Sequence, residues 1–242
     1  QKDMQGAEKI LRDLLARNEK NKRGRLLLAR ILENEKRLPD AEKEYKILVN
    51  QEPENDGPKL LLAQFYNRTN KKKEAETILK DLIATHPDKI EPRIYLARFY
   101  AGNKQDAAMV ETLQKAIRDM PDQYVPYNIL ARHELGKMNK EKAMELLDRF
   151  IAKVKRGPDL LKAKTFLAGI YYRDGKPDGA MKLVEEVLKE NPKDVAGLAL
   201  KGDILVSKKD YVGAIAEYRT ILGEEPENIP VSLALARAHL LN

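Results

Sequence analysis

One short motif in this chain carries a side chain suited to binding anions. The tripeptide Leu-Ala-Arg occurs at residues 28–30, 96–98, 130–132 and 235–237. The planar guanidinium of arginine forms two parallel hydrogen bonds with a carboxylate, which favours recognition of acidic groups. At one phase of a repeated unit the chain therefore carries a ladder of residues: Arg30, Gln64, Arg98, Arg132, Gly169, Asp203 and Arg237.

A second position, four residues before each member of this ladder, is mostly apolar. It holds Leu26, Leu60, Ile94, Asn128, Thr165, Ala199 and Leu233, so apolar pockets are expected beside the arginines. The predicted binding residues are Arg30, Gln64, Arg98, Arg132, Arg237, Leu26, Leu60, Ile94 and Asn128. The alternative is internal: each arginine pairs with a glutamate of a neighbouring helix and holds the repeats together.

Catalytic chemistry is not indicated. An active site needs convergent groups, such as a nucleophile beside a base, paired carboxylates or metal ligands. The histidines, His86, His133 and His239, fall at unrelated positions of the repeat. The chain has no cysteine, and its glycines are too sparse for a phosphate-binding loop. We therefore predict a non-catalytic protein without a metal or cofactor.

The composition is that of a chain able to bury a core, with 43% apolar and 34% charged residues and a net charge of +7. No apolar run approaches the roughly 18 residues of a membrane span, and no signal-peptide pattern is expected within residues 1–242. Nucleic-acid binding favours aromatic residues interleaved with a basic patch. Here the aromatic residues fall mostly at core positions of the repeat, so no nucleic-acid partner is expected.

The elements that carry the ladder follow from an internal repeat. Small residues recur every 34 residues, with one spacing of 37: Ala29, Ala63, Ala97, Ala131, Ala168, Gly202 and Ala236. Twelve residues after the first six of these comes a second, usually small position: Ala41, Ala75, Met109, Ala143, Ala180 and Ala214. Four residues further on, a large apolar side chain follows: Tyr45, Leu79, Leu113, Leu147, Val184 and Tyr218. A proline ends five of these six units.

Each unit has the pattern of two amphipathic helices separated by a short polar turn. The small residues mark where the paired helices cross, because a larger side chain there would push the axes apart. Asp40, Asp106, Asp178 and Asp210 precede the second helices and are expected to cap them. Pro158 follows the extra residues of the 37-residue spacing, so we expect the next helix to begin a turn early.

This small, small, large and Pro pattern in a 34-residue helix–turn–helix unit resembles the tetratricopeptide repeat family. The resemblance implies an all-α, right-handed superhelical solenoid that forms one domain over residues 1–242. Half repeats are expected at 1–21 and 229–242. The full repeats are expected at 22–55, 56–89, 90–123, 124–160, 161–194 and 195–228. The chain is then a segment of a longer array.

In this family the first helix of each repeat lines a concave groove that binds peptides or partner proteins. The resemblance therefore implies a protein-interaction module, and the arginines suit an acidic segment. The carboxylate clamp of the chaperone-binding members is not matched, since its positions here hold Leu26, Arg30, Leu61, Glu91 and Tyr95. The alternative is a structural scaffold or a self-associating array. The repeats are similar in style to bacterial cell-envelope members of the family, including those of exopolysaccharide export, although no compartment follows from the sequence.

Overall fold

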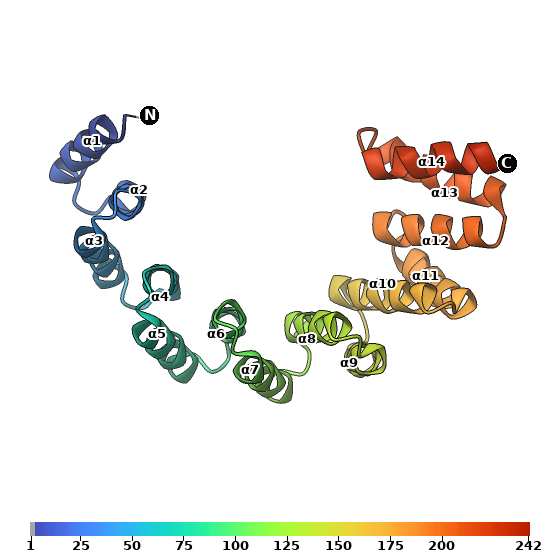
Figure 1. Ribbon diagram of the computed structural model, residues 1–242, viewed down its shortest axis with the longest axis horizontal. Helices are drawn as coiled ribbons and strands as arrows, with labels where there is room; N and C mark the ends of the chain where they lie inside the picture. The colour runs from blue at the N-terminus through green and yellow to red at the C-terminus, as the bar shows by residue number, and fades with distance from the viewer. Residues whose placement is uncertain (1–2) are drawn as a thin grey trace. The chain divides into compact units, whose positions relative to one another are not determined.

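The computed structural model describes residues 3–242. Within them the chain forms fourteen α-helices and no strand (Figure 1), so the all-α prediction is confirmed. The helices are α1 (Met4–Arg17), α2 (Lys22–Asn34), α3 (Leu38–Gln51), α4 (Asp56–Arg68), α5 (Lys72–Thr85), α6 (Glu91–Gly102), α7 (Asp106–Asp119), α8 (Tyr124–Gly136), α9 (Lys140–Lys153), α10 (Pro158–Arg173), α11 (Pro177–Glu190), α12 (Val195–Ser207), α13 (Tyr211–Glu224) and α14 (Ile229–Leu241).

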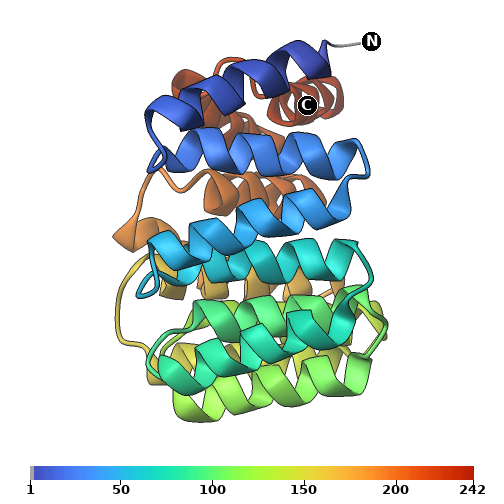
Figure 2. The same cartoon turned by 90° about the vertical axis from the view of Figure 1, so that its left-hand side faces the viewer.

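The chain divides into two compact units, one ending at Ala116 and the other beginning at Ile117, within α7. In the first unit α2 packs on α3 and α4 on α5, and contacts of α3 with α4 and of α5 with α6 join the pairs. Figure 2 shows these helices lying across the view one above another. In the second unit α8 pairs with α9, α10 with α11 and α12 with α13, and α14 packs on α13. A single solenoid over the whole chain stays a prediction.

The small residues of the repeat lie in the core of each helix pair. In the first unit Ala29 of α2 and Ala41 of α3 have no exposed surface. In the second unit the same is true of Ala131 in α8 and Ala143 in α9. Tyr45, at the large apolar position, is only 1% exposed. These alternating small and large side chains let the paired helices approach closely.

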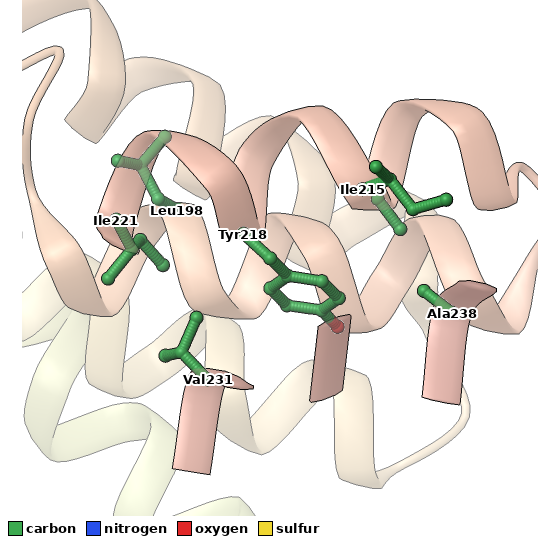
Figure 3. Packing of buried hydrophobic residues seen from close by; sticks show 7 residues of the cluster. Leu198, Ile215, Tyr218, Ile221, Val231 and Ala238 are labelled. Atoms are coloured by element: carbon green, nitrogen blue, oxygen red, sulfur yellow. The ribbon is translucent and has the colours of Figure 1, made fainter. Parts of the chain in front are cut away.

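The core at the α12–α14 end of the second unit is built around a tyrosine. Figure 3 shows this cluster, which contains Leu198, Ala214, Ile215, Tyr218, Ile221, Val231 and Ala238. Tyr218 of α13 is 2% exposed, and its ring lies against Gly202 of α12. A Cβ placed on Gly202 would lie 2.4 Å from Cε1 of that ring. Glycine leaves room for this placement of the ring, in which the Tyr218 hydroxyl bonds to Asp203. In the first full repeat Tyr45 bonds to Glu33 instead, and the equivalent small residue is Ala29.

We expect Gly202→Ala to lower the free energy of unfolding by about 1–2 kcal/mol, because an overpacking cost of about 1–3 kcal/mol exceeds the gain in helix propensity. Placed in a Tyr218→Leu background, the same change should cost nothing, since Ala63 and Leu79 occupy these two positions in another repeat. Urea melts of the two single variants and the double variant measure the effect. Equal stability of Gly202→Ala and the wild-type chain would contradict this packing.

The turns inside the repeats share one backbone device. Each contains a residue in the left-handed region with φ between 58° and 73°: Lys36, Asn70, Lys104, Met138, Gly175 and Lys209. The N–H of the following residue bonds to a carbonyl five residues earlier, as in Arg37 to Leu32 at 2.9 Å. This closes the first helix in the manner of a C-terminal cap. The second helix therefore leaves the turn in a similar way in every repeat.

The capping prediction is right for only part of its set. Asp210 caps α13 by accepting a hydrogen bond from the N–H of Gly213 at 2.9 Å. Asp40 and Asp178 do not cap, because α3 and α11 begin earlier and place these residues inside the first turn. Both helices have a proline in that turn, which favours the earlier start. Asp106 is the first residue of α7.

The irregular spacing lengthens one helix. α10 begins at Pro158 and has 16 residues, the longest helix in residues 3–242, as the sequence indicated. Gly157 precedes it with φ of 117°, a conformation that side chains rarely adopt. The extra residues are therefore absorbed by one additional helical turn and the glycine before it.

Candidate partner-binding surface

In the first unit the ladder arginines point away from internal partners. Arg30 and Arg98 are both exposed, and neither forms an ion pair with any residue in the range 3–242. Leu26, one turn before Arg30 on α2, is half-buried. Leu60 and Ile94 differ from expectation, because they are only 9% and 6% exposed and belong to the core. The charged residues of this face are accessible, while two of its predicted apolar positions serve helix packing.

Two predicted residues, Gln64 and Arg98, line a common cavity of about 390 Å³ between α4, α5 and α6, which we call the first niche. It is lined by Ala63, Gln64, Asn67, Leu79, Tyr95, Arg98 and Phe99. Its apolar members Ala63, Leu79 and Phe99 are buried and form the base. The amide and guanidinium groups of the others provide polar contacts, so the first niche suits a side chain with an apolar stem and a polar end.

The predicted binding residues lack five that line the first niche: Ala63 and Leu79, which were assigned to the helix crossing, and Asn67, Tyr95 and Phe99. A signal existed, because Asn67 is three residues after Gln64 and Tyr95 is three residues before Arg98 on the same helices. Residues three apart share a helix face. Asn67 is also tied to the next repeat, since its Oδ1 accepts a hydrogen bond from Nδ2 of Asn103 at 2.9 Å.

In the second unit the structure brings Arg132 and Asn128 together. Nε of Arg132 donates a hydrogen bond to Oδ1 of Asn128 at 2.8 Å, one turn earlier on α8. The guanidinium carbon also lies 4.8 Å from the ring centroid of Phe166 on α10. The sequence indicated the two α8 residues but not their aromatic partner.

Arg237 lines a second cavity, of about 700 Å³, formed by residues of α10 and α12–α14 and here called the second niche. The second niche lies at the same position in the repeat as the first niche, but Asp203 replaces Gln64 at the equivalent residue. Oδ1 of Asp203 accepts a hydrogen bond from the Tyr218 hydroxyl at 2.8 Å. Burial and this carboxylate raise the pKa of Tyr218. An acid beside the arginine makes the second niche less suited to an anion than the first.

An ion pair that joins the first two full repeats is formed by an arginine four residues after the ladder position, not by a ladder arginine. Arg68 binds Glu33 with two hydrogen bonds, Nε to Oε1 at 2.7 Å and Nη2 to Oε2 at 2.9 Å. The Tyr45 hydroxyl donates to the same carboxylate at 3.1 Å. The hydrogen bond from Arg68, opposed by burial, lowers the pKa of Glu33. Arg68 thus plays the cross-repeat role that was the alternative for the ladder arginines, while Arg30 acts on Glu33 only through its charge.

A second cross-repeat network in the first unit centres on Glu42 of α3. Its carboxylate accepts from the Tyr66 hydroxyl at 2.9 Å and pairs with Lys46 at 2.8 Å and Lys71 at 2.5 Å. Burial acts to raise the pKa of Glu42, but these three partners outweigh it and hold the pKa at about 2. The ionised form is therefore part of the folded structure.

This network predicts a pH dependence of stability. An unfolded glutamate has a pKa of about 4.3, so a folded value of about 2 contributes stability above pH of roughly 4.3 that is lost as the pH falls toward 2. We expect Glu42→Gln to lower the urea midpoint at pH 7, with the difference from wild type shrinking over that interval. The exposed Glu145, changed to Gln, is the control. A difference that stays constant from pH 5 to pH 2.5 would contradict the prediction.

In the described part of the chain no helix is long and apolar enough to cross a membrane.

Antiparallel helix pairs in tandem, with niches between successive first helices, define a helical repeat protein. Three family models described as "Tetratricopeptide repeat" match residues 1–54, 59–89 and 167–229, together more than half of the chain. The chain belongs to the tetratricopeptide repeat family.

Known proteins match this chain in part. The human "Protein O-mannosyl-transferase TMTC3" is 38% identical over 77 residues, 31% of this chain and 8% of that protein. The structure of yeast Tom70 has a TM-score of 0.66 at 14% identity, covering 98% of this chain and 58% of that one. A structure of the APC/C hetero-tetramer Cut9-Hcn1 has a TM-score of 0.55 at 16% identity, covering 98% and 46%. The two structural likenesses concern the fold, and this chain spans about half of those chains.

Proposed function

We propose that this chain is a non-catalytic protein-interaction module that binds an acidic segment of a partner protein along the exposed faces of its first helices. Repeat arrays of this kind present extended surfaces for partners. The observation that carries the proposal is the first niche, where the exposed Arg98 lies over a buried apolar base. Arg98 has no ion pair in residues 3–242.

The free energy of partner binding is more favourable for an arginine that has no internal ion pair to break. An arginine that already holds a buried carboxylate would have to break that pair to bind a partner, whereas Arg30 and Arg98 are available. A charge-assisted hydrogen bond to a partner carboxylate contributes about 1.5–3 kcal/mol when it forms away from water. The apolar base of the first niche supplies burial beside it. Together they suit short segments in which acidic and apolar side chains alternate.

We expect the triple variant Arg30→Gln, Arg98→Gln and Arg132→Gln to lose partner binding and most of its salt dependence, because salt screens exposed charges. Its melting temperature should change little, since exposed charges contribute about 0–1 kcal/mol each. The control replaces Lys43, Lys73 and Lys182, which are exposed on second helices, by Gln. It removes the same charge from another face.

A partner is first captured with residues 1–242 and identified by mass spectrometry. The purified partner is then titrated against the wild-type chain, the arginine variant and the lysine variant at two salt concentrations. Selective loss in the arginine variant supports the proposal. An arginine variant that melts early yet binds its partner normally would refute it, and would leave the structural scaffold as the function.

A further inference from the structure

Arg132 is held differently from the other ladder arginines. Its Nε–H is engaged by Asn128 at 2.8 Å, and its guanidinium carbon lies 4.8 Å from the Phe166 ring centroid. One contact comes from α8 and the other from α10, so the plane of the guanidinium is fixed by two successive repeats. Within residues 3–242, Arg30, Arg98 and Arg237 have neither a hydrogen bond nor a ring contact of this kind.

The outer edge of the Arg132 guanidinium remains available. Among residues 3–242, no acceptor bonds its two terminal nitrogens, and the side chain is exposed. Burial raises the pKa of Tyr124 to about 12. The charge of Arg132 acts to lower this pKa, and the charge of Asp159 acts to raise it. Asp159 is itself paired with Lys162 at 2.9 Å. The Asp159 carboxylate therefore already has a cationic partner.

The approach to this edge is open on the next helix. The ladder position after Arg132 is Gly169 on α10, and a Cβ placed there would meet nothing within 4 Å. Gly169 lies three residues after Phe166, on the same helix face. A partner backbone can therefore come closer to the α10 surface here than at a position that carries a side chain.

We infer that Arg132, Asn128 and Phe166 form a preassembled receptor for one carboxylate side chain of a partner segment. The two terminal nitrogens of a guanidinium match the two oxygens of a carboxylate. Because the stacked ring and the amide already fix the arginine, little side-chain entropy is lost on binding. The inference deepens the proposed function and rests on it, and it assigns to Arg132 the distinction between a carboxylate and an uncharged amide.

Lysine substitution separates geometry from charge. Arg132→Lys keeps the positive charge but removes the fixed planar guanidinium, whereas Arg149→Lys is the same change at an exposed arginine of the second helix α9, outside the proposed binding surface. Phe166→Leu removes the aromatic face and keeps an apolar side chain. Fluorescein-labelled octaglutamate is the probe, octaglutamine is its uncharged counterpart, and fluorescence anisotropy gives the dissociation constants. Circular dichroism melts check that each variant is folded.

We expect octaglutamate to bind the wild-type chain and octaglutamine not to bind. Arg132→Lys should weaken octaglutamate binding about tenfold or more, as expected for loss of a charge-assisted bidentate contact, and Phe166→Leu should weaken it less. Arg149→Lys should change it by less than about threefold. Equal losses at Arg149→Lys and Arg132→Lys, or no loss at either, would overturn this inference alone. A wild-type chain that binds neither peptide would overturn the proposed acidic partner as well.

Discussion

Replacing Phe150 by alanine is expected to lower the free energy of unfolding of the second unit by about 3–5 kcal/mol. Phe150 of α9 has no exposed surface. Its ring centroid lies 5.2 Å from that of Tyr124 and 5.3 Å from that of Tyr127, both on α8. Truncation would leave a cavity that two tilted rings cannot fill, and it would remove two aromatic contacts.

Chemical denaturation followed by far-ultraviolet circular dichroism measures this effect. Phe150→Leu is the matched control, because it keeps much of the volume and should cost clearly less than the alanine variant. Repeat arrays unfold through neighbouring units, so the loss should appear as an early transition of part of the helical signal. Identical denaturation curves for Phe150→Ala and the wild-type chain would show that the rings do not pack as described.

The second large effect is expected from enlarging a helix crossing. Ala143 of α9 is fully buried, as is Ala131 of α8. Ala143→Leu adds volume where the helix axes approach, and it should destabilise by about 1–3 kcal/mol. Ala152→Leu provides the control, because Ala152 lies on the same helix and is exposed. Urea midpoints that are lowered equally by both changes would contradict the assignment of Ala143 to the crossing.

Much of the fold was predictable because the repeat has to satisfy one packing requirement many times. Small residues such as Ala29 and Ala41 recur wherever two helices cross, and the register gives the number of helices directly. The start of α10 at Pro158 also followed from the chain, since proline is favoured in the first turn of a helix. These features depend on local sequence and on steric size.

The surface was less predictable because it depends on which rotamers and partners the side chains choose. Leu60 and Ile94 share the phase of Leu26, yet they are buried while Leu26 is half-buried. Arg68, outside the predicted set, took the internal pairing with Glu33. The stacking of Arg132 on Phe166 joins residues 34 apart on successive first helices, so no local pattern indicates it.

The central claim is that a partner segment binds beside Arg98 in the first niche. The most direct measurement places a photo-activated benzoylphenylalanine at Gln64, which lines this niche, and maps the cross-linked peptide by mass spectrometry. A second chain carries it at Lys43, exposed on α3. We predict light-dependent adducts with an acidic segment at Gln64, few at Lys43, and loss of the Gln64 adducts on adding Arg98→Gln. Adducts that form equally at both positions, or that persist without Arg98, would contradict the claim.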